Sequence, residues 1–183
     1  SYADDGAFKA LSLDWLQASM QRQYVYNFDW MGRPIIQYPQ DMVAMQELVW
    51  RVRPDLIIET GIAHGGSLVL SASLLALLDM SDAIEAGTTL DPRASRRKVL
   101  GVDIDIRAHN RVAIEAHPMA SRIAMIQGSA IAPEVVKQVR DFAQGYQRVL
   151  VCLDSMHTHD HVLGELNAYA PLVTPGSYCV VFD

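Results

Sequence analysis

The sequence has few of the features that mark secreted, membrane or nucleic-acid-binding proteins. Its 183 residues include two cysteines, Cys152 and Cys179, and both stand in apolar runs, which argues against a disulfide framework. No apolar run is long enough to span a membrane, and the N-terminal residues lack a signal-peptide pattern. We therefore expect a protein without a membrane span, in the reducing environment of the cytoplasm.

Positive charge is also scarce. Lys and Arg number 15 against 21 Asp and Glu, for a net charge of −6, and basic residues cluster at positions 93–98 alone. Binding to a nucleic-acid backbone needs several clustered cations, so no nucleic-acid partner is expected. The segment 24–39 is rich in aromatic residues. It could line a substrate cleft, form a subunit interface, or be an irregular segment that packs on the core. We expect a small-molecule or carbohydrate acceptor and a homo-oligomer.

A dinucleotide-binding fingerprint is missing as well, because three other residues separate Gly61 from Gly65. The stretch 55–67 instead predicts a short buried strand that ends on Glu59, a glycine turn, and an apolar helix from Ser67 to about residue 78. An acid two residues before the first glycine resembles the first motif of class I S-adenosylmethionine methyltransferases. In that interpretation Glu59 faces the methionine end of the cofactor, Gly61 and Gly65 make room for it, and Ser67 joins the site. The alternative is an ordinary strand-to-helix turn.

Strand and helix patterns alternate along residues 40–183, which indicates an α/β fold: a Rossmann-like sheet with helices on both faces. A helix capped by Asp41 is expected at 39–52, a polar loop at 79–97, and further strands at 99–105, 122–127, 148–153 and 177–182. We assign 1–39 to a helical and aromatic extension and 40–183 to the cofactor-binding domain. Because the last strand would be interior yet ends at Asp183, the C-terminal part of the sheet is expected to be missing.

Acids follow the ends of the predicted strands, and in a parallel sheet these ends share one edge, where ligands bind. Asp103 is the first candidate to accept hydrogen bonds from both ribose hydroxyls, and Asp105 is the second. Ser129 follows the next strand and is placed to meet the adenine edge. Each of these residues has the alternative of being an ordinary loop residue.

The segment 154–161 combines three histidines at alternate positions with acids on both sides. A zinc hydrolase with the pattern H-x-H-x-D-H is one interpretation, but this segment is one residue short of that pattern. Oxygen-ligand chemistry fits better: Asp154 and Asp183, at adjacent strand tips, are candidate Mg²⁺ ligands. His157 is then the candidate base that takes the proton of a substrate hydroxyl, while His159 and His161 cap or orient the next helix.

Four separated segments resemble the cephalosporin hydroxylase family: 32–41, 56–67, 101–107 and 153–162. The resemblance implies the class I methyltransferase fold with a Mg²⁺ site, and similarity to macrolide and sugar O-methyltransferases. In those enzymes an Asp-x-x-His supplies a metal ligand and the base, which corresponds here to Asp154 and His157. They also carry a Glu-Asp pair at the end of the fifth strand, where this sequence has Phe182 and Asp183.

These observations predict an S-adenosylmethionine-dependent, Mg²⁺-assisted O-methyltransferase acting on a hydroxyl of a sugar, glycolipid or natural product. Two alternatives stay open. One is the hydroxylase that the family name implies, and the other is a cofactor-binding subunit without activity of its own.

Overall fold

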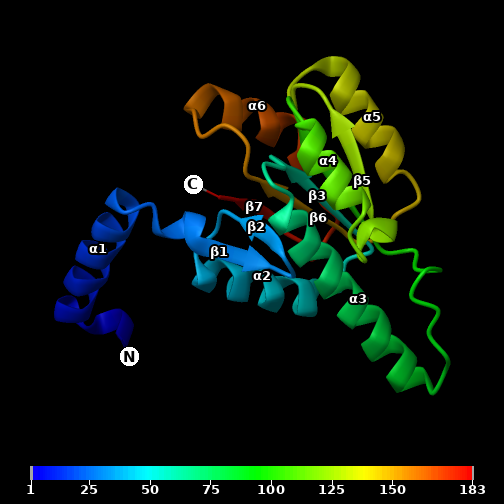
Figure 1. The fold of residues 1–183 in the computed structure, drawn as a ribbon, viewed down its shortest axis with the longest axis horizontal. Coiled ribbons are helices and arrows are strands. Elements are labelled where there is room, and N and C mark those ends of the chain that lie inside the picture. Colours follow the sequence, from blue (N-terminus) through cyan, green and yellow to red (C-terminus); the bar gives the residue numbers. More distant parts are fainter. Residues whose placement is uncertain (1, 183) are drawn as a thin grey trace.

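Five parallel strands form the central sheet, in the order β5-β4-β3-β6-β7 (Figure 1). The structure, a computed structural model, describes residues 2–182. The strands of this sheet are β3 (Leu56–Thr60), β4 (Lys98–Asp103), β5 (Ile123–Gln127), β6 (Val149–Leu153) and β7 (Cys179–Val181). A separate antiparallel hairpin joins β1 (Phe28–Trp30) to β2 (Arg33–Ile35). The helices are α1 (Gly6–Gln21), α2 (Pro39–Val52), α3 (Gly66–Ala86), α4 (Ala108–Glu115), α5 (Pro133–Ala143) and α6 (His159–Tyr169).

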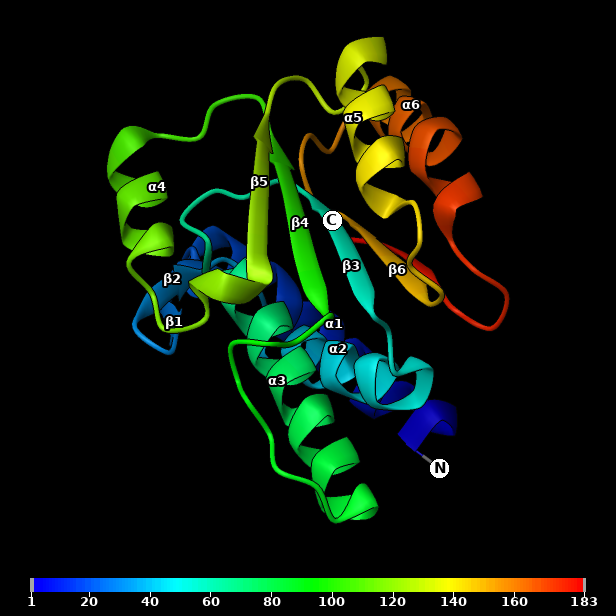
Figure 2. The same cartoon turned by 90° about the vertical axis from the view of Figure 1, so that its right-hand side faces the viewer.

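The two central strands, β3 and β6, are buried along their whole length. Successive side chains of a strand point to opposite faces, so both faces of these strands must be apolar. Ile57 packs into the layer that α2 and α3 cover, whereas Ile58 packs into the layer that α5 and α6 cover. Figure 2 shows these two helical layers on opposite sides of the sheet. The predicted fold class, an α/β sheet with helices on both faces, is confirmed.

The chain reverses its direction of travel across the sheet at β3. From β3 it passes through α3 to β4 and through α4 to β5, and α5 then returns it to β6 on the other side of β3. Such a reversal leaves a crevice at the carboxyl ends of the strands, which is where open α/β sheets bind ligands. The topology therefore places the candidate site beyond the tips of β3, β4 and β6.

Helix α3 is longer than the sequence predicts. It runs for 21 residues to Ala86 and ends on Gly87, which adopts the left-handed conformation (φ 64°) typical of a helix end. The expected loop at 79–97 is thus wrong for its first eight positions, because Asp79 and Asp82 lie on the helix and bind arginines. By length and composition alone α3 would also qualify as a membrane span, but half of its apolar window is buried against the rest of the protein.

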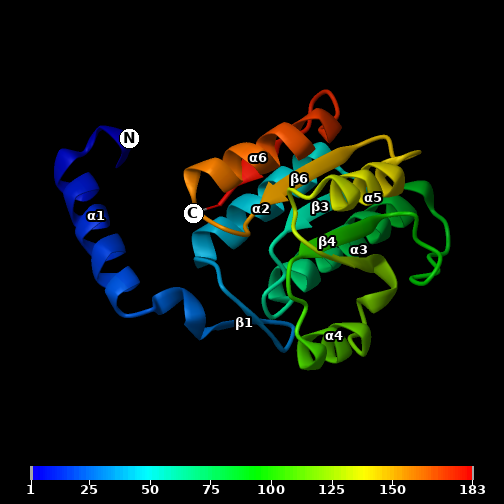
Figure 3. The same ribbon diagram turned by 90° about the horizontal axis from the view of Figure 1, so that it is seen from above.

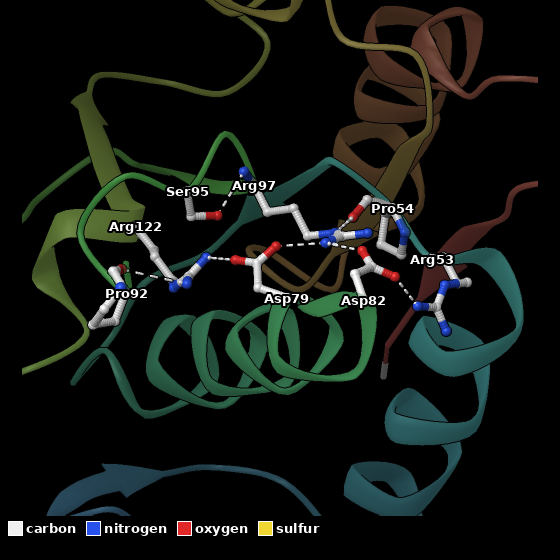
Figure 4. A network of polar contacts seen from close by, with 8 residues as sticks. All are labelled: Arg53, Pro54, Asp79, Asp82, Pro92, Ser95, Arg97 and Arg122. Carbon is white, nitrogen blue, oxygen red and sulfur yellow. Dashed lines mark hydrogen bonds and ion pairs between the residues drawn. The ribbon is translucent and has the colours of Figure 1, made fainter. Parts of the chain in front are cut away.

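An ion-pair network ties the C-terminal half of α3 to the amino edge of the sheet (Figure 4). The Arg97 guanidinium lies 2.5 Å from Asp79 and 2.8 Å from Asp82, and Arg122 lies 2.5 Å from the second oxygen of Asp79. Arg53, at the end of α2, contacts Asp82 from the other side. The side chain of Arg122 is 3% exposed and that of Asp79 is 12% exposed. The network therefore holds paired charges in a largely dry environment.

The N-terminal segment has two parts with different packing. Helix α1 stands away from the sheet (Figure 3) and exposes Phe8, Leu11 and Trp15. The β1–β2 hairpin instead packs on α3: Ile35 is buried in the core, and the Trp30 indole donates to Ser73 Oγ at 3.0 Å. The proposed domain boundary at residue 39 stays a prediction.

The start of α2 differs from the expectation. Tyr38 is the N-cap residue, without a side-chain cap hydrogen bond, and Asp41 lies in the first turn of the helix. The prediction of Asp41 as the cap is wrong because Pro39, whose fixed φ suits the first helical position, starts the helix two residues earlier.

We expect the Asp79→Ala variant to lose about 3–5 kcal/mol of unfolding free energy, because it leaves the buried Arg122 guanidinium without a carboxylate. Urea unfolding measures this loss. The matched control is Lys137→Ala, which breaks an exposed ion pair with Asp141 and should cost about 1 kcal/mol or less. Equal, small losses in both variants would show that the network contributes no more than a surface pair.

Candidate functional site

Two cavities adjoin at the carboxyl edge of the sheet, where the strand reversal predicts a ligand. The larger has a volume of about 410 Å³ and the smaller about 210 Å³. Four residues line both cavities: Gly61, Ala63, Asp154 and Ser155. The glycine turn after β3 and the residues after β6 thus separate two neighbouring spaces, which suits a ligand with two chemically different halves.

Gly61, directly after β3, contacts the tips of both neighbouring strands, β4 and β6. Its N–H donates to Val102 O on β4 at 2.8 Å, and its φ is +87°. A Cβ at this position would lie 1.9 Å from the backbone oxygen of Asp154, beyond β6. The close approach of the β6 tip therefore requires a glycine here, whether or not a ligand is bound, and the predicted contact of Gly61 with a cofactor stays a prediction.

Gly65 and Ser67 occupy different places at the start of α3. Gly65 is the N-cap residue at φ +85°, and a Cβ there would lie 2.4 Å from Cδ1 of Ile114 on α4. Gly65 is absent from the lining of both cavities, whereas Ser67 lines the larger one. Helix α3 has no side-chain cap, so the first N–H groups of the helix remain available to polar atoms in the turn.

Glu59 lies beneath the site and lines neither cavity. Its side chain is 3% exposed and accepts a hydrogen bond from Ser67 Oγ. Burial raises the pKa of Glu59 to about 8, although the hydrogen bond from Ser67 opposes the shift. The carboxyl group is therefore mostly protonated at neutral pH and acts on the site through Ser67. Its predicted contact with a cofactor stays a prediction.

The smaller cavity contains Asp103 and Ser129, as the sequence predicts for a ribose and adenine side, but Asp105 is not among its lining residues. The Asp103 carboxylate also holds the glycine turn. One oxygen accepts from Ile62 N at 2.7 Å and Ala63 N at 3.2 Å, and the other accepts from Asp105 N at 3.0 Å. Asp103 therefore both shapes the turn and faces the space.

Asp154 lies between the two cavities, and His157 lines the larger one. His157 Nε2 lies 3.7 Å from Asp154 Oδ1. Burial raises the pKa of Asp154 to about 6, although His157 and a hydrogen bond from Gln37 oppose the shift. The His157 side chain is 44% exposed, so it is open to a ligand instead of being packed in the core.

The other two histidines do not join His157. His159 contacts Asp160 at 2.9 Å on the surface, and His161 lines the smaller cavity 3.6 Å from the buried carboxyl of Glu165. Within residues 2–182, no three His, Cys, Asp or Glu side chains gather as a metal site. Asp183, the second predicted Mg²⁺ ligand, lies outside the described residues.

Among the residues that line the larger cavity without having been predicted as site residues are Tyr26, Gln37 and Asp41. They come from the segment before the sheet and are remote in sequence from Asp154. The resemblance at 32–41 and the aromatic density of 24–39 pointed to this region, but the only role assigned to any of the three side chains was that of a helix cap for Asp41.

We expect the Glu59→Gln variant to lose part of the pH dependence of stability between about pH 4.5 and pH 8. Folded Glu59 keeps its proton up to about pH 8, whereas the unfolded residue releases it near 4.5. The folded state binds more protons in this window, so the wild-type unfolding free energy falls as pH rises through it. Glutamine stays neutral and removes this contribution. Urea unfolding across the window checks it, and parallel curves for the two proteins would contradict it.

The family described as Rhamnosyl O-methyltransferase/CmcI matches residues 22–183. A rhamnosyl O-methyltransferase of Mycobacterium leprae is 30% identical over 157 residues, covering 84% of this chain and 59% of the relative. One from Mycobacterium bovis is 26% identical over 148 residues, covering 78% and 51%. The chain thus spans between half and three-fifths of the length of these relatives.

Solved structures show the same fold. CmcI, in a form described as Mg-SAM, superposes with a TM-score of 0.58 at 17% identity, covering 86% of this chain and 58% of CmcI. CalS11, described as a TDP-rhamnose 3'-O-methyltransferase of calicheamicin biosynthesis, superposes with a TM-score of 0.58 at 18% identity, covering 79% and 63%. Because the family match covers the chain from residue 22 to its last residue, the chain belongs to the Rhamnosyl O-methyltransferase/CmcI family, and the resemblance to cephalosporin hydroxylases is confirmed.

Proposed function

We propose that this protein is an S-adenosylmethionine-dependent O-methyltransferase whose acceptor is a sugar hydroxyl. The observation that carries the proposal is the pair of adjoining cavities at the strand reversal, with Asp103 in one and His157 in the other. The names of the relatives, rhamnosyl O-methyltransferases, support the reaction and the acceptor class.

The described residues fit this cofactor. Asp103 and Ser129 would hold the nucleoside half in the smaller cavity, since a carboxylate can accept from ribose hydroxyls. The glycine turn and Ser67 would hold the amino-acid half, where the uncapped start of α3 favours a negatively charged carboxylate. When bound, S-adenosylmethionine supplies a methyl group on a positively charged sulfur.

The chain's own residues then have two tasks. The walls of the larger cavity hold the acceptor oxygen in line with the methyl carbon and sulfur, and such positioning supplies much of the rate acceleration. With S-adenosylmethionine bound, His157 would take the hydroxyl proton as the acceptor oxygen bonds to the methyl carbon, and the electron pair of the broken carbon–sulfur bond would stay on the sulfur. Histidine is the side chain that most often serves as a general base near neutral pH.

We further propose that Mg²⁺ assists the reaction, supported by the CmcI structure described as Mg-SAM. Mg²⁺ keeps several waters and is often bound through one or two carboxylates, and Asp154 offers one at the junction of the cavities. When bound, the ion would lower the pKa of a nearby hydroxyl. We also propose a cytoplasmic location and a homo-oligomer, the latter supported by the exposed apolar side chains of α1.

S-adenosylhomocysteine should bind the purified protein, and Asp103→Asn should weaken that binding at least about tenfold, or roughly 1.4 kcal/mol. The matched control is Asp105→Asn, since Asp105 is exposed and outside both cavities. Calorimetric titration of the three proteins measures the affinities. Failure of the wild type to bind would remove the proposal, and equal affinities for all three would remove Asp103 from the site.

The His157→Ala variant should lower kcat by about 10²–10⁴-fold on the true acceptor, because the hydroxyl proton loses its acceptor. Affinity for S-adenosylhomocysteine should stay unchanged, since His157 lines the cavity away from Asp103. His159→Ala is the control, because His159 is exposed and bonded to Asp160 alone among the described partners. Wild-type turnover by His157→Ala would show that another group is the base.

A further inference from the structure

Gln37 lines the larger cavity, and only part of the hydrogen-bonding capacity of its side chain is satisfied. The residue is 7% exposed. Its amide hydrogen-bonds to the Asp154 carboxylate, whereas its Oε1 has no hydrogen-bond partner within residues 2–182. A buried acceptor without a partner costs about 1–3 kcal/mol. A ligand that brings a hydrogen-bond donor to this wall would recover that cost.

Asp41 lies near Gln37 in the same wall. It belongs to the first turn of α2, is half-buried, and forms no ion pair with a cation in the part of the chain that the structure describes. Burial raises its pKa, and its charge in turn acts on Asp154. The wall thus presents two kinds of acceptor, an amide oxygen and a carboxylate, without a Lys or Arg beside them in the cavity lining.

The lining of the same cavity also has apolar and aromatic side chains. It includes Met20, Val25 and Tyr26, and Tyr26 is 62% exposed. Pyranose sugars combine hydroxyl donors on their rim with C–H groups on their faces. Acceptor oxygens next to an exposed aromatic ring therefore match the surface of such a ring better than that of a fully apolar or a cationic ligand.

We propose that Gln37 and Asp41 form a recognition site for neighbouring hydroxyls of a pyranose acceptor, with Tyr26 against the C–H face of the sugar. The proposal rests on the proposed function and deepens it, because it names the residues that select and orient the acceptor. Gln37 has a double role: its N–H group positions the Asp154 carboxylate, while its oxygen accepts from the sugar. An acceptor held there lies beside both Asp154 and His157.

A purely structural role is the alternative for Asp41, because a carboxylate in the first turn stabilises a helix by about 0.3–1 kcal/mol. That role would change the stability of Asp41→Asn but not its affinity for a sugar. The test therefore measures sugar binding directly, in the presence of saturating S-adenosylhomocysteine, with methyl α-L-rhamnopyranoside as the probe and NMR saturation transfer as the readout.

We expect Asp41→Asn and Gln37→Leu to weaken binding of the probe at least tenfold, with affinity for S-adenosylhomocysteine within about twofold of the wild type. Tyr26→Ala should weaken probe binding, and Tyr26→Phe should not. Glu47→Gln, on the exposed side of α2, is the matched control and should bind both molecules normally.

Three results would overturn the proposal. The first is a wild type that binds S-adenosylhomocysteine but not the probe, and the second is undiminished probe binding by both Asp41→Asn and Gln37→Leu. The third is an Asp41→Asn variant that loses affinity for Mg²⁺ but binds the probe normally. The last would identify a cation site. A wild type that fails to bind S-adenosylhomocysteine would instead refute the underlying function, so the two failures are distinguishable.

Discussion

The tips of β3, β4 and β6 approach so closely that the chain has no space for a side chain at Gly61. The N–H of Gly61 bonds to β4, and the carbonyl of Asp154 occupies the volume that a Cβ would need. Asp154 N in turn donates to Thr60 O at 3.0 Å. Since the Asp103 carboxylate also binds the glycine turn, three strands and the turn form one hydrogen-bonded unit. The relative positions of Asp103 and Asp154, and so of the two cavities, follow from this packing.

The pKa values of buried carboxyl groups shift in opposite directions at the two edges of the sheet. At the amino edge, burial alone would raise the pKa of Asp79, but hydrogen bonds from Ser95, Arg97 and Arg122 hold it below its usual value. At the carboxyl edge, no Lys or Arg of the described chain lines either cavity, and burial dominates. The pKa values of Glu59 and Asp154 are raised there to about 8 and about 6. The amino edge thus pairs its acids with arginines, whereas the carboxyl edge, within the described residues, holds acids without an arginine or lysine partner, of which Asp154 lines both cavities.

The sequence predicted most of the fold because the strands and helices carry strong local patterns. Strands β3, β4 and β6 are apolar runs that end on an acid or a glycine turn, and both signals are local. The C-terminal half of α3 was missed because its polar residues, Asp79 and Asp82, bind Arg97, which the pattern of a single helix cannot reveal. The packing of Gly61 against Asp154 was also not predicted, since its neighbour at the β6 tip is remote in sequence.

The residues of the site also divide into those that local sequence patterns predicted and those that depend on tertiary packing. Asp103, Ser129, Asp154 and His157 follow strand ends and could be placed on one edge from topology alone. Gln37 and Asp41 could not, because their position depends on how the β1–β2 hairpin packs on α3. Glu59 was recognised by its spacing from the glycines, yet its depth beneath Ser67 depends on the packing of α3 on the sheet. Local signals identify the strand-end residues, and tertiary packing decides which side chains face the cavities.

The Asp103 carboxylate has little hydrogen-bonding capacity left for a ligand. A carboxylate has about four lone-pair positions, and three hydrogen bonds already occupy this one, from the amides of Ile62, Ala63 and Asp105. A nucleoside that donates two ribose hydroxyls to Asp103 must therefore displace at least one amide. The longest of the three bonds, from Ala63 at 3.2 Å, is the weakest competitor, and Ala63 already adopts a positive φ of 46°. In the proposed complex, entry of the nucleoside would exchange one hydrogen-bond donor for another, and the turn would then change its conformation when the site is filled.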